Sequence, residues 1–425
     1  MLIEFSVSNF RSIRERQTLS MVAAARLRKR ENIFIPDVLG EKIPALLKVV
    51  AIYGPNASGK SNLIKAFEVF ERVVSSRPTS DKQEFPVDAF RFDAELANKP
   101  SDFEVHFIIH RQRYSFELSL TRDRVHKERL TAFPKGKSQL LYSRVHSGVG
   151  DVYEFGGALE GGSALHEVWK SLTSAKSLFL TQAVLNSNEE LKQLRLPWQW
   201  LAKSAMNVSD SMRFLMKPAQ ALMAEMPEFG KMISEWLSSI DVPIDGIQSK
   251  RLRGSDEGGD SNAESETSGK GGFKYNPKDS FETTLTHVTS LGSAEFELKD
   301  ESDGTRSLIG FALPWFLMEM DKSSQPKLLM MVDEMDSSLH PKIVEVLVSK
   351  FLSSKLHRQL IFTTHDTHLM DSKLLRRDQF WITERDGNGA TQLRSIHDFE
   401  GREGEDIEKR YYEGRYRGLP IVHQG

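Results

Sequence analysis

The sequence predicts an α/β fold with a mixed central sheet, an antiparallel β subdomain and a helical insertion. Short apolar runs at 46–53, 327–332 and 359–364 are typical of buried parallel strands, which are covered on both faces. Alternating residues between about 85 and 155 predict an antiparallel meander. Apolar residues at helical spacing dominate 163–237 and predict helices over 166–180, 189–205 and 214–240, the last interrupted by Pro218 and Pro227. The predicted division is therefore 1–160, a helical insertion at 161–242, and 243–425.

Length and composition limit the classes of function that the protein can have. With 425 residues the chain has room for about two or three domains and a large core. It has 57 basic and 59 acidic residues, so any nucleic-acid surface must be local. Cysteine is absent, which excludes disulfides, thiolate zinc sites and cysteine nucleophiles and favours a reducing cytoplasm. No apolar run approaches the ~20 residues of a membrane helix, and the amino terminus does not have the order of a signal peptide.

A phosphate-binding loop is predicted at residues 54–61. The segment GPNASGKS fits the pattern G-x-x-x-x-G-K-[ST] and lies between the apolar strand 46–53 and an amphipathic helix at 61–74. In such a loop, backbone N–H groups and the positive end of a helix converge on a polyphosphate. A glycine-rich turn that matches by chance would not explain the flanking strand and helix. The residues assigned to nucleotide binding are Gly54, Asn56, Ala57, Ser58, Gly59, Lys60 and Ser61, with Lys60 on the outer phosphates and Ser61 on Mg²⁺.

A second cluster follows two later apolar runs. The run 327–332 ends in Asp333 and Glu334, at the sheet edge where the phosphate loop is also expected. We expect Asp333 to hold Mg²⁺, directly or through water, and Glu334 to orient and polarise the water that attacks the γ-phosphate. The run 359–364 ends at His365. A histidine there is commonly structural, but its place at the same edge favours a hydrogen bond to the γ-phosphate.

The segment 302–306 (SDGTR) precedes another amphipathic helix. An ordinary Ser or Asp N-cap would explain it without a ligand. A capped helix end beside a glycine is equally a phosphate site, and this chain's own site does not need a second one. The sharper hypothesis is that Ser302 and Gly304 bind the γ-phosphate held by a second subunit.

Other polar segments have simpler interpretations. Residues 254–272 are acidic and rich in Gly and Ser, which predicts a mobile loop. The basic cluster at 26–30 fits a solvated face or a polyanion site, and the solvated face is the simpler explanation. Arg11 and Ser12 fit a solvated strand end. The basic residues between 122 and 129 could face a nucleic acid or a partner, but a charged, exposed sheet edge explains them as well.

The order of these motifs carries a family resemblance. NFRSI, GPNASGKS, SDGT, MMVDEMDSSLHP and TTHD, in this order, resemble the ABC-type ATPase heads of the RecF, SMC and OLD group. The SDGT form, the DEMDSSLHP run and the terminal KRYYEGRYRGLP (409–420) are more similar to RloA/AbiL-type AAA-family ATPases. The similarity spans essentially the whole chain, although the specific motifs cover a small part of it.

This resemblance implies a P-loop NTPase fold of ABC-ATPase type in which two heads sandwich two ATP molecules. It implies roles in cis for Lys60, Ser61, Asp333, Glu334 and His365, and roles in trans for Ser302 and Gly304. It also places Asp336 at the dimer seam and brings Arg11 and Ser12 toward the nucleotide. Two departures stand out. Asp303 stands where the transporter motif LSGGQ has a glycine. The glutamine that normally couples the second lobe to Mg²⁺ cannot be assigned, because the surroundings of the available Gln182 look helical.

The preferred hypothesis is a cytoplasmic ATPase that works as a switch, with ATP and Mg²⁺, in a homodimer or higher oligomer. The resemblance suggests the ATPase component of a bacterial anti-phage, abortive-infection-like system. It would act with a separate effector, TOPRIM-like or another nuclease, because no nuclease pattern follows His365. The alternatives are a RecF/SMC-like DNA-repair or recombination ATPase with salt-sensitive DNA binding, a transporter ATPase, and a scaffold that binds ATP without hydrolysing it. The trigger and the choice between ATP and GTP stay open.

Overall fold

The computed structural model describes residues 1–76, 83–208, 215–240, 242–252, 267–268, 274–276, 279–320, 328–371, 373–402 and 404–419. The chain divides into two compact units. The first comprises Met1–Asn207, Lys327–Asp333 and Val348–Gly425, and the second comprises Val208–Pro326 and Glu334–Leu347. These boundaries differ from the predicted division at 160 and 242, which stays a prediction. Apart from residues 267 and 268, the loop predicted at 254–272 lies outside the described residues.

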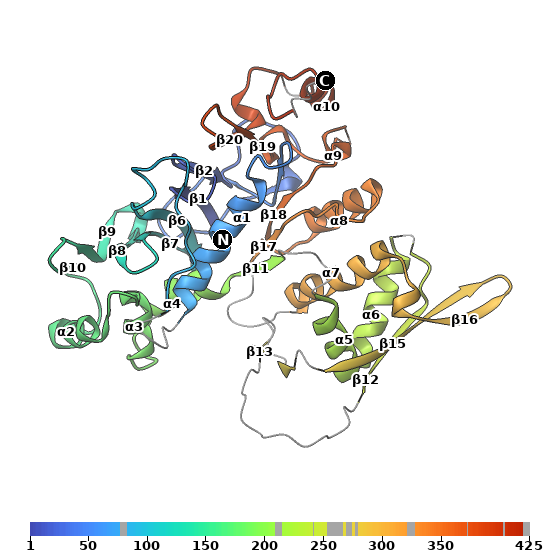
Figure 1. Cartoon of the computed structure of the whole chain (residues 1–425), viewed down its shortest axis with the longest axis horizontal. Helices are drawn as coiled ribbons and strands as arrows, with labels where there is room; N and C mark the ends of the chain where they lie inside the picture. The colour runs from blue at the N-terminus through green and yellow to red at the C-terminus, as the bar shows by residue number, and fades with distance from the viewer. Residues whose placement is uncertain are drawn as a thin grey trace. The chain divides into compact units, whose positions relative to one another are not determined.

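The first unit contains the mixed central sheet that the sequence predicts (Figure 1). Its described strands follow the order β11-β17-β18-β5-β19-β20. From β17 to β19 neighbouring strands are parallel, and β20 is antiparallel to β19. Every residue of β17, β18 and β5 is buried, which explains their continuous apolar sequences. The strands are β5 (Val49–Tyr53), β11 (Ala205–Val208), β17 (Leu329–Val332), β18 (Gln359–Thr363), β19 (Phe380–Arg385) and β20 (Thr391–Ser395).

An antiparallel sheet forms the rest of this unit's β structure, with described strands in the order β10-β9-β8-β7-β6-β1-β2. The meander expected between 85 and 155 is present as β6 to β10. Helix α1 (Lys60–Ser75) packs against this sheet, because the rings of Phe67 and Phe70 lie 5.1 and 6.3 Å from that of Phe5. The strands are β1 (Leu2–Ser8), β2 (Gln17–Ser20), β6 (Ser101–Ile109), β7 (Gln112–Leu120), β8 (Val125–Ala132), β9 (Gln139–His146) and β10 (Asp151–Phe155).

The basic segment 122–129 does not form a sheet edge, so that interpretation was wrong. Strand β8 lies between β7 and β9. Its charges are matched by carboxylates instead. Lys127 Nζ bonds Glu117 on β7 at 2.5 Å, Arg124 pairs with Asp151 on β10 at 3.1 Å, and Arg122 pairs with Asp88.

Three helices of the first unit differ from the predicted ones. The helix expected over 166–180 is two helices, α2 (Gly162–Leu172) and α3 (Phe179–Leu185), and the one expected over 189–205 is α4 (Arg195–Lys203), after which β11 begins. The break between α2 and α3 has a tertiary cause. The carbonyl oxygens of Ser174 and Ser177 accept hydrogen bonds from the buried Arg144 guanidinium at 2.8 and 2.7 Å, so the backbone there leaves the helical pattern.

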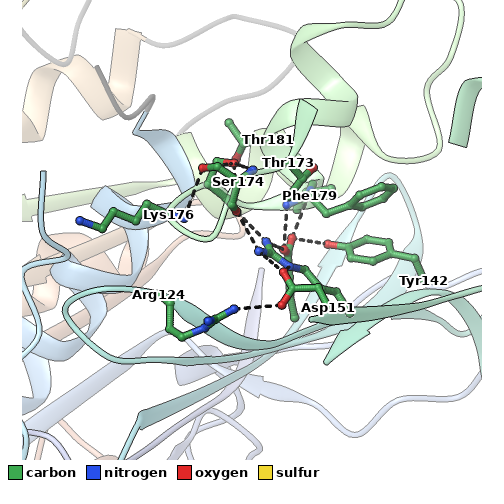
Figure 2. Close-up of polar contacts among 12 residues, drawn as sticks. Arg124, Tyr142, Asp151, Thr173, Ser174, Lys176, Phe179 and Thr181 are labelled. Atoms are coloured by element: carbon green, nitrogen blue, oxygen red, sulfur yellow. Dashed lines mark hydrogen bonds and ion pairs between the residues drawn. The ribbon is translucent and has the colours of Figure 1, made fainter. Parts of the chain in front are cut away.

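A buried polar cluster surrounds that break, and Figure 2 shows Tyr142, Asp151 and Phe179 converging on it. Glu128 on β8 is fully buried and accepts hydrogen bonds from the Tyr142 hydroxyl at 2.7 Å and from the backbone N–H of Phe179 and Leu180 at 2.8 and 2.9 Å. Burial raises the pKa of Glu128, and the Arg144 guanidinium at 3.8 Å opposes that shift. The cluster therefore fixes the start of α3 to the antiparallel sheet.

The second unit combines α5 (Met216–Glu225), α6 (Pro227–Ser238) and α7 (Asp303–Met320) with a sheet of described strands in the order β12-β15-β16. Of the two interruptions expected in 214–240, the one at Pro227 is present, because Pro227 is the first residue of α6, where proline fits. Pro218 does not interrupt the helix but lies in the first turn of α5. Phe229 on α6 packs edge-on against Phe316 on α7 at 5.8 Å. The strands are β12 (Gly246–Leu252), β15 (Ser280–Thr289) and β16 (Gly292–Glu297).

The other strands and helices complete the two units. They are β3 (Ile33–Phe34), β4 (Leu46–Leu47), β13 (Thr267–Ser268), β14 (Lys274–Tyr275), α8 (Pro341–Ser353), α9 (His368–Asp371) and α10 (Ile407–Tyr412).

Candidate nucleotide-binding site

The loop between β5 and α1 depends on its two glycines. Gly54 and Gly59 have φ of +146° and +101°, which side chains rarely adopt. A Cβ at Gly54 would collide with Thr383, and one at Gly59 would collide with Thr391. The close approach of these threonines is the physical reason why the pattern needs glycine at both positions.

Lys60 folds back over the loop. Its Nζ donates hydrogen bonds to the carbonyl oxygens of Gly54 and Pro55 at 2.8 and 3.2 Å, and the residue is 6% exposed. The ammonium group therefore lies at the opening residues of the loop, where a phosphate group could replace these carbonyls as its partner.

Three hydroxyl groups hold the loop to the β19–β20 hairpin. The hydroxyls of Ser58 and Thr383 are 2.5 Å apart, Thr383 Oγ1 donates to the carbonyl of Tyr53 at 3.1 Å, and Thr391 Oγ1 donates to the carbonyl of Ser58 at 2.8 Å. Sequence reasoning did not identify Thr383 or Thr391. The signal available in the sequence was weak, since both belong to ordinary strand segments with no motif.

Arg11 and Ser12 follow strand β1, and the structure brings Ser12 to the phosphate loop. Its Oγ accepts a hydrogen bond from Asn62 Nδ2 at 2.7 Å and lies 2.8 Å from Thr391 Oγ1. Arg11 has a different partner, because its Nε is 3.9 Å from Asp88 Oδ2. Nucleotide contact by either residue stays a prediction.

Asp333 is the point where the two halves of the predicted site meet. Its Oδ1 accepts hydrogen bonds from Ser61 Oγ at 3.1 Å and from Thr363 Oγ1 at 2.6 Å. A carboxylate beside a hydroxyl is a set of hard oxygen donors that suits Mg²⁺, which takes few protein ligands and completes its shell with phosphates and water. Thr363 is a residue that sequence reasoning missed, although it is the last residue of β18, two positions before His365.

His365 lies with the phosphate loop at the rim of one cavity. The cavity has a volume of about 930 Å³ and is lined by Gly54, Asn56 and His365, and by the C-terminal residues Tyr412 and Arg417, among others. The structure therefore places His365 on the same cavity as the opening residues of the loop. It also brings the C-terminal motif there, which the sequence had not assigned to the site.

The remaining candidate residues belong to the second unit. Ser302 Oγ accepts a hydrogen bond from the N–H of Thr305 at 3.1 Å, as an N-cap does. Gly304 packs closely on the turn after Glu334, because a Cβ there would lie 2.7 Å from the carbonyl oxygen of Ser338. Within that turn the carbonyl of Asp336 accepts from the N–H of Leu339 at 3.0 Å, and Glu334 has a left-handed φ of +52°.

Gln182 lies in helix α3, where its Oε1 accepts a hydrogen bond from Asn186 at 3.2 Å. Its surroundings are helical, as the sequence indicates, and the coupling glutamine stays unassigned. Among the residues that the structure describes, no helix is long and apolar enough to cross a membrane.

The fold and the site together define the class of protein. The phosphate loop follows β5, the acidic pair follows β17, and His365 follows β18, the strand between them in the sheet. This arrangement, beside an antiparallel β subdomain, is that of a P-loop NTPase of ABC-ATPase type.

The chain belongs to the family described as "AAA domain, putative AbiEii toxin, Type IV TA system", which matches residues 49–371. The matched segment runs from the first residue of β5 to the last residue of α9. It includes the phosphate loop, the segment 302–306 (called the signature below), the acidic pair Asp333 and Glu334, and His365. The finer RloA/AbiL-type assignment stays a prediction. No curated protein matches the chain.

Solved structures with similarity to the chain include heads of SMC proteins. The "SMC head domain from Thermotoga maritima" is 14% identical, with a TM-score of 0.40 and coverage of 93% of this chain and 98% of that one. An SMC head bound to the C-winged helix domain of ScpA is 12% identical, with a TM-score of 0.41 and coverage of 93% and 97%. An SMC head with an extended coiled coil, bound to a ScpA domain from Pyrococcus furiosus, is 12% identical, with a TM-score of 0.38 and coverage of 97% and 98%.

Proposed function

We propose that this protein is an ATP-dependent molecular switch that binds and hydrolyses ATP across a dimer of ABC-type heads. We propose further that it is the ATPase and sensor component of a bacterial anti-phage, abortive-infection-like system that acts with a separate effector protein. The observation that supports the ATPase proposal is that Ser61 and Thr363 both donate hydrogen bonds to Asp333 Oδ1. Two motifs far apart in the sequence meet there.

Each site residue has a distinct task in this proposal. Lys60 and the loop N–H groups bind the outer phosphates, and Ser61 and Asp333 hold Mg²⁺, which when bound neutralises charge on the phosphates. Glu334 orients the attacking water and accepts its proton. His365 donates a hydrogen bond to the γ-phosphate.

The proposed dimerisation is supported by the position of Ser302 at the start of α7. Ser302 caps the N-terminus of α7, an end whose N–H groups favour an anion, and it would meet the γ-phosphate held by the other subunit. Gly304 lies against the turn that contains Asp336, so the predicted trans contact and the predicted seam residue are neighbours within one unit. ATP would then favour the dimer, and hydrolysis would relax it.

The alternative, a DNA-repair or recombination ATPase, needs a basic surface that is free to bind phosphates. In the basic segment 122–129, which could have faced a nucleic acid, Arg122, Arg124 and Lys127 each pair with a carboxylate. A phosphate contact there would have to displace an existing ion pair, and we therefore favour the switch.

The ATPase proposal is tested by Glu334→Gln. We expect turnover to fall by about 100-fold or more, as removal of a general base does, while the Kd for ATP changes less than about twofold. The matched control is Glu345→Gln on α8, a pair partner of Lys342 that has no assigned role in the site. Wild-type protein that binds ATP but does not hydrolyse it would favour the scaffold instead.

The effector part has its own experiment. Tagged Glu334→Gln protein, purified from the native host with ATP, is expected to retain a stoichiometric partner that mass spectrometry identifies as a nuclease. Recovery of DNA-repair proteins would support the alternative, and recovery of the protein without any partner would contradict a stable effector complex.

A further inference from the structure

The C-terminal arm, residues 406–419, contains most of the terminal motif, and the proposed function gives it no role. Asp406 caps its helix α10 by accepting a hydrogen bond from the N–H of Lys409 at 2.8 Å. Beyond α10 the backbone turns back through Gly414, Arg417 and Gly418, which have φ of +74°, +60° and +69°. The hydroxyl of Tyr411 closes this turn by donating to the carbonyl oxygen of Gly418 at 2.9 Å. The arm therefore has a defined structure.

One end of the arm packs on β19. A Cβ at Gly418 would collide with the side chain of Ile382, and Arg417 Nη1 lies 3.4 Å from Glu384 Oε1. Ile382 and Glu384 flank Thr383, the residue that holds Ser58 of the phosphate loop. The terminal motif needs glycine at position 418 because this residue packs closely on β19, a strand of the site.

The other end of the arm holds the segment after His365. Thr367 Oγ1 donates a hydrogen bond to Glu408 Oε1 at 2.6 Å and lies 3.0 Å from the hydroxyl of Tyr412. Since the Thr367 proton is used on the carboxylate, the Tyr412 hydroxyl donates to Thr367. The chain Tyr412–Thr367–Glu408 joins two segments that border the same cavity as His365.

We propose that the C-terminal arm is a working part of the ATP site, in which Glu408 and Tyr412 hold Thr367 and thereby position His365. Thr367, Glu408 and Tyr412 are positioning residues, because they act through His365. This inference rests on the proposed role of His365 at the γ-phosphate. By linkage, a nucleotide that fixes His365 also favours the ordered arm, and the ordered arm favours productive binding. The order of the C-terminal arm would then change with the nucleotide that is bound.

The first test is a kinetic comparison of Thr367→Val, which removes the hydroxyl and keeps the shape, with Thr367→Ser, which restores it. We expect kcat of Thr367→Val to fall by about tenfold, the scale of a lost hydrogen bond to a charged group, with the Kd for ATP within about twofold of wild type. Thr367→Ser is expected to recover at least half of the lost rate. The control is Arg415→Gln, an exposed arm residue that pairs with Glu413 and does not line the cavity.

A double-mutant cycle separates positioning from general stability. In a His365→Ala background, Thr367→Val is expected to have almost no further effect on kcat, because its route to the chemistry is already removed. Full additivity of the two losses would overturn the proposal. Equal losses in Thr367→Val and Arg415→Gln would overturn it as well.

A second measurement does not depend on turnover. In Glu334→Gln protein, ATP with Mg²⁺ is expected to slow amide exchange in the peptide spanning α10 by at least about threefold, and Thr367→Val is expected to abolish that protection. Unchanged exchange in protein shown to be saturated with ATP would overturn the coupling. Failure of the wild-type protein to hydrolyse ATP would instead count against the proposed function, while the exchange result would still decide whether the arm responds to nucleotide.

Discussion

Ser61 donates a hydrogen bond to Oδ1 of Asp333 over 3.1 Å, although 272 positions separate the two residues in the chain. The contact exists because β5 and β17 run parallel on either side of β18, so the residues that follow them meet at one sheet edge. The geometry is suited to an oxygen-ligated cation beside a polyphosphate.

Asp333→Asn keeps the size of the side chain and its ability to accept from Ser61 but removes the negative charge. We expect the Kd for ATP with Mg²⁺ to rise at least about tenfold, while the Kd for ATP in EDTA changes less than about twofold. Titration calorimetry under both conditions measures the difference. Asp371→Asn, an exposed carboxylate on α9, is the control. An equal loss with and without Mg²⁺ would mean that Asp333 holds the loop and not the metal.

Thr363 orients the carboxylate of Asp333, the proposed Mg²⁺ ligand. Its hydroxyl fixes the carboxylate at 2.6 Å, and partners of metal ligands are typically worth about 10- to 100-fold in metal affinity. Thr363→Val is therefore expected to weaken Mg²⁺-dependent ATP binding by about tenfold, and Thr363→Ser to restore it. The residue is fully buried in β18, so circular dichroism should first confirm that Thr363→Val retains the fold. Mg²⁺ dependence identical to wild type would refute the positioning role.

The trans assignment of the signature is tested by Ser302→Arg. A bulky cation at the capped end of α7 should prevent a second subunit's nucleotide from approaching, so ATP-dependent dimerisation is expected to disappear. Light scattering of Glu334→Gln protein with ATP gives the mass directly. Ser353→Arg, at the end of α8, adds the same charge elsewhere. A dimer that persists in Ser302→Arg shows that the assignment is wrong.

The buried cluster of Figure 2 predicts a large loss of stability. Glu128→Ala leaves Arg144, which is 1% exposed, without one of its buried carboxylate partners and leaves two N–H groups of α3 without an acceptor. We expect the free energy of unfolding to fall by about 3–5 kcal/mol in urea titrations. Glu117→Ala, which breaks a more exposed pair with Lys127, should cost less than about 1 kcal/mol. Similar losses in both variants would contradict the importance of burial.

Acid stability should depend on Glu104. The hydrogen bond from His106, followed by the one from Arg16, lowers the pKa of Glu104 from 4.5 to about 2, against the effect of burial. Because the folded-state pKa is the lower one, this stabilisation is present above pH 4.5 and is lost as the pH falls toward 2. The difference in unfolding free energy between wild type and Glu104→Gln should therefore shrink across that range. A difference that stays constant with pH would exclude this linkage.

Several features follow from the sequence because their causes are local. The glycines of the phosphate loop mark a strand-to-helix turn with left-handed backbone, and continuous apolar runs mark parallel strands that are buried on both faces. The order of the motifs then predicts that the loop, Asp333 and His365 share one edge, since the carboxyl ends of parallel strands meet there. These inferences need no knowledge of distant contacts.

Tertiary structure alone decided the contacts that support this site. Thr363, Thr383 and Thr391 carry no local pattern, and their roles depend on which strands become neighbours. The break between α2 and α3 is set by Arg144, which takes two carbonyl oxygens that a continuous helix would use. In the basic segment 122–129, Lys127 on β8 pairs with Glu117 on the neighbouring strand β7, whereas Arg122 and Arg124 precede β8 and pair with Asp88 and Asp151. The position of the terminal motif depends on the contacts of Thr367 with Glu408 and Tyr412. These side chains are about 40 residues apart in the sequence, so no periodic pattern predicts that they meet.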